Sequence, residues 1–166
     1  MCIRDRDPPA TCALGARDLG SVQDGNDITT NAYRTYPAGD GDWFRFRMRD
    51  LTSFLYEGFI PGTTIQAIVR LSGVAAGEQL QFEIVEDSCS GGGSPTVVGP
   101  GQEGRIDGRV FCDDYTVDAN GNIIAIDDSK NYFIHVFPVG DSFQCTSYTL
   151  RVEVNEEFFN GFCFGS

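Results

Sequence analysis

The chain has 166 residues, among them 20 Gly, 13 Phe and 6 Tyr, and a formal net charge of −12 from 24 acidic and 12 basic residues. This acidic balance excludes a polyanionic nucleic acid as a partner and disfavours anionic membrane surfaces, because both need a basic footprint. The length suits one domain, and no apolar run approaches the roughly 18–20 residues that span a bilayer.

The chain starts with "MCIRDRDPPATC", which lacks the apolar core of a signal peptide. "MCIRDR" resembles the translated adapter read-through that prefixes open reading frames in metagenomic assemblies. We therefore expect residues 1–6 to be a sequencing artefact in a metagenomic fragment, and residues 1–12 to form an N-terminal tail. The true N-terminus, with its signal peptide, is expected to be missing from this fragment. The alternative is a short charged N-terminal tail.

Alternation of apolar and polar residues predicts strands along most of the chain. In "DWFRFRMR", Phe44, Phe46 and Met48 are expected to face a core, and the residues between them to face solvent. The same alternation occurs in "TTIQAIVRLS", "EQLQFEIVED" and "SYTLRVEV", and it is typical of antiparallel sheets with one wet face. "NYFIHVF" is apolar on both faces, which predicts a central strand.

Turn residues separate these strands. Asn120-Gly121 predicts a hairpin with a type I′ turn, in which both central residues have φ > 0. "PVGDSF" predicts a second hairpin, between the central strand and the last one, and "IQAIVRL" is expected to pair with "LQFEIVE". Roughly eight short strands favour an all-β fold, a two-sheet antiparallel β-sandwich of jelly-roll type over residues 13–156. Residues 157–166 are expected to be a C-terminal linker.

With Cys2 set aside, the cysteines are scattered, which indicates disulfides and an oxidising compartment: Cys12, Cys89, Cys112, Cys145 and Cys163. None forms a Cys-x-x-Cys pair, which disfavours structural zinc. The spacing does not select a pairing. We expect Cys89–Cys112, which would staple a Gly-rich loop and add roughly 3 kcal/mol, and Cys12–Cys145.

The order of these segments resembles a known family. "ARDLGSV", "GDGDWFRFRM", the strands "IQAIVRL" and "LQFEIVE", a Gly-rich loop and "KNYFIHVFPVGDSFQCTSYTLRVEV" follow one another over residues 16–154. This pattern is similar to the bacterial pre-peptidase C-terminal domain, a β-sandwich found beside catalytic domains of secreted peptidases and in the collagen-binding domains of collagenases. The resemblance implies a secreted accessory module that binds a substrate or surface, or that is removed during maturation.

The resemblance also implies a calcium site, because some members hold Ca²⁺ where an N-terminal segment meets the loop before the core strand. Asp40 and Asp42 match the loop carboxylates. The family's Glu-Pro-Asn-Asp motif has no counterpart, and "QDGNDITT", with Asp24 and Asp27, is the nearest candidate. Calcium needs six to eight oxygen ligands. The alternative is that the aspartates only form a tight turn.

Two further patterns suggest chemistry that simpler structures also explain. Asp118, Asn120 and Asn122 have the spacing that opens an EF-hand loop, but a hairpin explains them as well. "GDS" at 140–142 suggests a serine hydrolase, yet the only histidine is His135 and the "GxSxG" context is absent. A chain with one His offers little acid–base chemistry near neutral pH.

Trp43, Arg45 and Arg47 form the best candidate contact surface, because Trp and Arg dominate binding hot spots. The alternative is a solvated arginine face with a covered indole. We expect a non-catalytic accessory module of a secreted bacterial protein, which targets an appended catalytic or adhesive domain of the same polypeptide to an extracellular polymer. The alternatives are a structural spacer or maturation segment without a ligand, and a small hydrolase.

Overall fold

A computed structural model describes residues 12, 15–23, 26–35, 41–49, 63–87, 89, 93–112, 115–125, 129–140 and 146–158. The regular elements are strands: β1 (Arg17–Gln23), β2 (Asp27–Thr35), β3 (Asp42–Arg49), β4 (Thr63–Ser72), β5 (Leu80–Glu86), β6 (Thr96–Val98), β7 (Gly104–Cys112), β8 (Tyr115–Val117), β9 (Ile123–Ala125), β10 (Lys130–Pro138) and β11 (Thr146–Phe158). No helix in the described part of the chain has the length and hydropathy needed to cross a bilayer.

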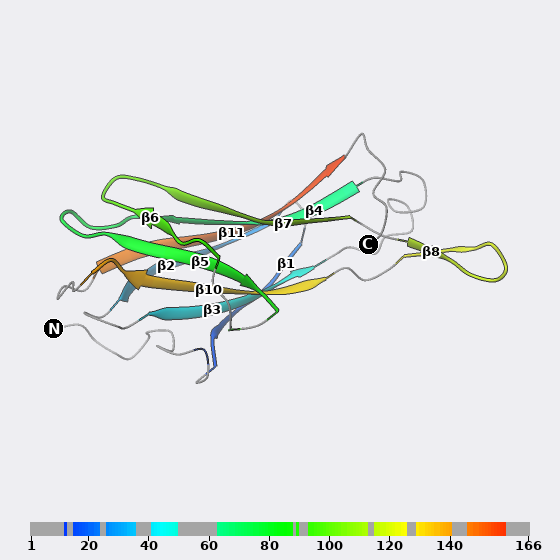
Figure 1. The fold of residues 1–166 in the computed structure, drawn as a ribbon, viewed down its shortest axis with the longest axis horizontal. Helices are drawn as coiled ribbons and strands as arrows, with labels where there is room; N and C mark the ends of the chain where they lie inside the picture. The colour runs from blue at the N-terminus through cyan, green and yellow to red at the C-terminus, as the bar shows by residue number, and fades with distance from the viewer. Residues whose placement is uncertain are drawn as a thin grey trace.

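Two stacked sheets form a sandwich (Figure 1). Sheet A has the strand order β1-β3-β10-β5-β6, and sheet B has the order β2-β11-β4-β7. A separate hairpin, β8–β9, projects from one end of the sandwich (Figure 1). The strand pairs are antiparallel except β1 with β3, which are parallel. The prediction of an all-β sandwich is confirmed, and the jelly-roll connectivity stays a prediction.

Alternating side chains from both sheets fill the space between them, as expected. In β3 the residues Phe44, Phe46 and Met48 are buried while the arginines between them are exposed. Tyr132 of β10 stacks on Phe46, with ring centroids 5.3 Å apart. The predicted central position of "NYFIHVF" is confirmed, because β10 lies between β3 and β5. The core also includes Ile65, Ala67, Val69, Leu71, Leu80, Phe82, Ile134, Val136, Tyr148, Leu150, Val152 and Val154.

Two predicted strand pairings are wrong. The strands β4 and β5 are consecutive in the chain but lie in different sheets, and so do β10 and β11. Instead, β4 pairs with β7 and β11, and β10 pairs with β3 and β5. The connection that begins at "PVG" therefore crosses from sheet A to sheet B and does not form a hairpin. Residues 141–145, which include Ser142, lie outside the described part of the chain.

The hairpin at Asn120-Gly121 is confirmed, but its turn differs from the predicted type I′. Gly121 has φ of 83°, whereas Asn120 is not among the residues with positive φ. Gly121 N donates to Asp118 O, and the Asp118 carboxylate accepts the backbone N–H groups of Asn120 and Asn122, each at 2.8 Å. The carboxylate thus organises a longer loop with Gly121 in the left-handed region. These bonds favour the hairpin interpretation over an EF-hand loop.

The fold extends beyond the predicted domain limits of residues 13 and 156. β11 continues to Phe158, and its last residues pair in register with the start of β4. At the other end, Cys12 forms a disulfide with Cys89, with a Cα–Cα distance of 5.8 Å. Cys12 is therefore joined covalently to the segment that follows β5.

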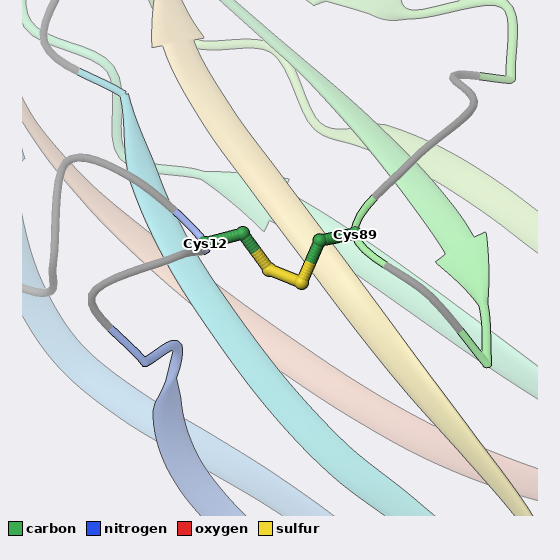
Figure 2. Close-up of a disulfide and its surroundings, with 2 residues drawn as sticks. All are labelled: Cys12 and Cys89. Carbon is green, nitrogen blue, oxygen red and sulfur yellow. A yellow bond between two sulfur atoms is a disulfide. The ribbon is translucent and has the colours of Figure 1, made fainter.

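The disulfide corrects both predicted cysteine pairings. Cys12 precedes β1 and Cys89 follows β5, and both strands belong to sheet A. In Figure 2 the bond spans β10 between these two segments. Cys112 ends β7 in sheet B, where it lies in register with Thr64, so Cys89 pairs across its own sheet and not with Cys112. Cys145 lies outside the described residues, and its predicted partner Cys12 is already bonded.

Candidate functional site

The outer faces of the two sheets differ in chemistry. Sheet B carries a network of ion pairs, in which Arg151 contacts Asp27 at 3.2 Å and Glu153 at 3.0 Å, while Arg70 contacts Glu153 at 3.3 Å and Glu103 at 2.8 Å. Such exposed pairs contribute little stability and are typical of a solvated surface. Among the side chains that the structure describes, the outward-facing aromatic residues Trp43, Phe133, His135 and Phe137 lie on sheet A, which makes its outer face the candidate contact surface.

A row of stacked rings runs across sheet A. His135 of β10 lies in register with Trp43 of β3, and their ring centroids are 4.2 Å apart with an interplanar angle of 7°. Phe137 stacks on the same imidazole at 4.4 Å and 23°. Two rings cannot occupy one face of an imidazole at these distances, so His135 lies between Trp43 and Phe137. We call these three residues the aromatic row.

Neighbouring residues hold the imidazole in place. A Cβ added to Gly41 would lie 2.1 Å from His135 Nε2, so only glycine leaves room for the ring at that position. On the other side, Glu83 Oε1 lies 3.2 Å from His135 Nδ1. Since an ionised carboxylate only accepts hydrogen bonds, Nδ1 carries the proton and donates. The aromatic row is therefore built from β3, β10 and β5 together.

Protonation of His135 is expected to destabilise the fold. Burial lowers the pKa of His135 below its ordinary value of 6.5, and the nearby Glu83 opposes this shift only in part. The unfolded chain then binds the proton first as the pH falls, so the stabilising contribution is complete above pH 6.5 and is lost as the pH falls below 6.5. Denaturant melts at pH 7.5 and 5.5 should show lower stability at pH 5.5, and His135→Gln should reduce this difference.

The comparison isolates one group, because His135 is the only histidine of the chain and few other side chains titrate between those pH values. Glu83→Gln serves as a second variant, since it removes the negative charge beside Nδ1 while it keeps an oxygen that can accept the proton and leaves the imidazole. Parallel pH profiles for the wild type and His135→Gln would contradict the prediction.

A polar groove lies beside the aromatic row. The register of β1 against β3 shifts between Asp18 and Ser21, where Gly20 has φ of 92°. The Asp18 carboxylate accepts Gly20 N at 2.8 Å and pairs with Arg45 at 2.9 Å. The Gly20 N–H first, and then Arg45, lower the pKa of Asp18. Such bulges often re-aim side chains at binding sites, and here the irregularity begins at Asp18, whose carboxylate contacts Arg45.

The groove has a volume of about 410 Å³, and its walls include Arg45, Arg47, Asn131 and Phe133. It combines guanidinium and amide donors, the carboxylate acceptors of Asp18 and Asp87, and phenylalanine side chains. Small-molecule and polymer sites are built from this mixture, in which a few polar groups orient a ligand against apolar surface. We call the groove and the aromatic row together the sheet A face.

The structure brings the three predicted contact residues together on the sheet A face. Trp43, Arg45 and Arg47 follow one another along β3 and point outward. The sequence prediction missed His135 and Phe137, because their partnership with Trp43 depends on the register of β10 against β3. Two features of the sequence point to them. In "FIHVF" the residues Phe133, His135 and Phe137 alternate with apolar residues and so face outward, and Gly41, two positions before Trp43, leaves space for a ring.

The predicted metal ligand Asp42 has a different role in the structure. Asp42 is the first residue of β3, and its side chain faces the core on the same side as Phe44. It is 1% exposed and accepts a hydrogen bond from the hydroxyl of Tyr148. Tyr148 is also buried and lies edge-on to Phe44, with ring centroids 6.4 Å apart at 89°. The Asp42 carboxylate thus joins sheet A to sheet B inside the sandwich.

Asp27 and Asp42 do not share an ion. Asp27 lies in register with Glu153 of β11. Asp42 contacts Tyr148, which is also in β11 but five residues before Glu153. These two positions of β11 are about 17 Å apart at roughly 3.4 Å per residue, and calcium holds its ligands at about 2.3–2.6 Å. Asp24 and Asp40 lie outside the described residues. Within the described ranges, no group of three His, Cys, Asp or Glu side chains is placed to hold a metal ion.

Compared with known proteins, the chain matches no family model and no curated protein. The resemblance to the pre-peptidase C-terminal domain therefore stays a prediction. The function is inferred from the sheet A face, since that surface combines stacked rings, arginines and a groove on one side of the sandwich.

Proposed function

We propose that this chain is a non-catalytic accessory module of a secreted bacterial protein, and that its sheet A face binds an extracellular polymer. In this role it targets a catalytic or adhesive domain of the same polypeptide to that polymer. The resemblance to the pre-peptidase C-terminal domain agrees with this proposal. The observation that carries it is the aromatic row on an outward-facing sheet surface.

An outward sheet face normally carries polar side chains, as sheet B does here. A tryptophan, a histidine and a phenylalanine on one such face form a stack with the histidine in the middle. The rings at the two ends of the stack, Trp43 and Phe137, suit the units of a polymer, because a unit can lie against a ring while arginines beside it bond to polar groups. The extended direction of β3 places Arg45 and Arg47 along one line with Trp43.

The surroundings of His135 support a binding role over a catalytic one. Both faces of the imidazole are covered by rings, Nδ1 is bonded to Glu83, and Nε2 lies against Gly41. A general base needs a free nitrogen within hydrogen-bond reach of the group that it deprotonates. The disulfide between Cys12 and Cys89 supports secretion, because such bonds persist in oxidising compartments.

The proposal is tested by retention of the purified chain on insoluble polymers, such as cellulose, chitin and collagen. We expect at least one polymer to retain the wild type, and Trp43→Ala to weaken the affinity about tenfold or more, as truncation of a hot-spot tryptophan does. Arg47→Ala removes an exposed side chain of the same face and should weaken binding without disturbing the core.

Arg151→Ala is the matched control, since it removes an exposed arginine from the outer face of sheet B. It should leave retention unchanged. No retention on any polymer would support the alternative of a structural spacer or maturation segment, and equal retention of the wild type, Trp43→Ala and Arg47→Ala would place the binding surface elsewhere.

A further inference from the structure

A second pocket lies at the open edge of the sandwich, away from the sheet A face. β6 pairs with β5 only over Leu80, Gln81 and Phe82, so it leaves the end of β5 without that neighbour. The pocket opens there and has a volume of about 350 Å³. Residues of both sheets line it: Ile84, Glu86, Gly93, Ser94, Ile106, Asp107, Gly108, Arg109 and Tyr132.

Tyr132 is the unusual member of this wall. Its side chain is only 2% exposed, and its hydroxyl is buried with no hydrogen-bond partner among the residues that the structure describes. A buried polar group without a partner loses its bonds to water and gains nothing in return, so such groups are rare in folded proteins. Burial first, and then Glu86 and Asp87, raise the pKa of Tyr132, which keeps the hydroxyl protonated and able to donate.

A bulge in β7 lies beside the Tyr132 ring. The register of β7 against β4 shifts between Gln66 and Ile68, which marks a bulge around Gly108. A Cβ on Gly108 would lie 3.1 Å from Ala67 O and 3.6 Å from Cε1 of Tyr132. The Gln66 side chain donates to Gly108 O at 2.9 Å, so the bulge carbonyl has its own partner and does not accept from Tyr132.

The polar groups around the pocket are of both kinds. Tyr132, Ser94 and Arg109 supply donors, and Glu86 and Asp107 supply acceptors. Asp107 is paired with Arg105 at 2.5 Å, whereas Glu86 makes no ion pair with another described residue. Ile84 and Ile106 provide aliphatic walls that pack against the core. A ligand with neighbouring donors and acceptors around a compact C–H surface complements this arrangement.

We propose that the pocket between β5 and β7 binds one neutral saccharide unit, with the Tyr132 hydroxyl donating to a ligand oxygen and Glu86 accepting from a ligand hydroxyl. The volume falls within the range of roughly 300–1,000 Å³ typical of small-molecule sites. Acidic ligands are disfavoured by Glu86 and Asp107, and cationic ligands by Arg109. The Tyr132 hydroxyl is buried at the wall of the pocket, so its side chain must shift toward a ligand oxygen, and the hydrogen bond then formed replaces no other bond among the described residues.

This site is tested by titrating the full chain with a sugar and measuring binding by calorimetry or NMR. The sugars are glucose, galactose, mannose and N-acetylglucosamine. At least one sugar should bind saturably, and Tyr132→Phe should weaken it tenfold or more, because the variant removes only the donating oxygen. Glu86→Gln should also weaken binding. Without sugar, Tyr132→Phe should melt at the wild-type temperature or above it, since it deletes a buried group that has no partner.

Arg151→Ala is the control, since it removes an exposed arginine that lines neither the pocket nor the sheet A face, and it should bind the sugar as the wild type does. Methylammonium chloride and sodium acetate serve as charged probes and should not bind. Three outcomes would overturn the proposal: binding of a charged probe alone, no saturable binding of any of the four sugars, or equal affinity of the wild type and Tyr132→Phe for a sugar. If water alone fills the pocket, we expect no saturable binding or equal affinity.

Discussion

Replacing Cys12 and Cys89 together by serine is expected to lower the free energy of unfolding by about 4 kcal/mol. The bond closes a loop with a sequence separation of 77 residues, and a crosslink over a loop of that size removes much of the conformational freedom of the unfolded chain. For a domain of this size the melting temperature should fall on the order of 10 °C. Denaturant and thermal melts of the wild type and the double variant measure both quantities.

Single variants identify the partner of Cys89. If Cys12 and Cys89 are bonded, Cys12→Ser and Cys89→Ser should each lose as much stability as the double variant, because either change breaks the same bond. The pairing of Cys89 with Cys112 that the sequence suggested makes the opposite prediction. In that case Cys12→Ser would have no effect on the Cys89 bond, and Cys112→Ser would match Cys89→Ser.

Asp42→Ala is expected to lower the free energy of unfolding by about 2–3 kcal/mol. The substitution removes the carboxylate that accepts the Tyr148 hydroxyl, and it leaves that hydroxyl buried between the sheets. A hydrogen bond from a buried donor to a charged group contributes about 1.5–3 kcal/mol, and the variant loses that contribution. Urea titration of the variant measures the loss.

Asp42→Asn is the matched control, because its side-chain oxygen still accepts from Tyr148 and its volume is nearly unchanged. It should lose less stability than Asp42→Ala, and equal losses would contradict the role of the hydrogen bond. Repeating the melts with a chelator tests calcium. We expect no shift, since the Asp42 carboxylate is engaged inside the sandwich. A chelator-dependent fall that Asp42→Ala abolishes would support the predicted site.

The inward and outward faces of the strands could be predicted from the sequence, since side chains alternate with a period of two in a strand. Phe44, Phe46 and Met48 are buried as that alternation requires. Strand partners could not be predicted in the same way. Alternation reports which side of a strand is covered but not which strand lies beside it, so β4 and β5 were wrongly paired.

The disulfide was missed for the same reason. Cys12 and Cys89 come together only because β1 and β5 lie in one sheet with β3 and β10 between them. Proximity along the chain favoured Cys112 as the partner, but β7 lies in the other sheet. Pairing of distant cysteines depends on strand order, which the local pattern does not contain.

The candidate site was predicted in part. Trp43, Arg45 and Arg47 belong to one strand, so their common face follows from local alternation alone. His135 and Phe137 join them through the register of β10, and the unpartnered hydroxyl of Tyr132 depends on a bulge in the opposite sheet. These features are set by tertiary packing, which a single sequence does not display.

The link between Cys12 and Cys89 also determines how the domain would respond to mechanical tension. Strands β1 to β5 all lie between the two cysteines, so traction applied to the two ends of the fold would bypass them through the covalent bond. The shielded segment, with its separation of 77 residues, would otherwise release about 260 Å of contour length at roughly 3.4 Å per residue. A tethered module of this design would lengthen under load only through the segment that follows Cys89.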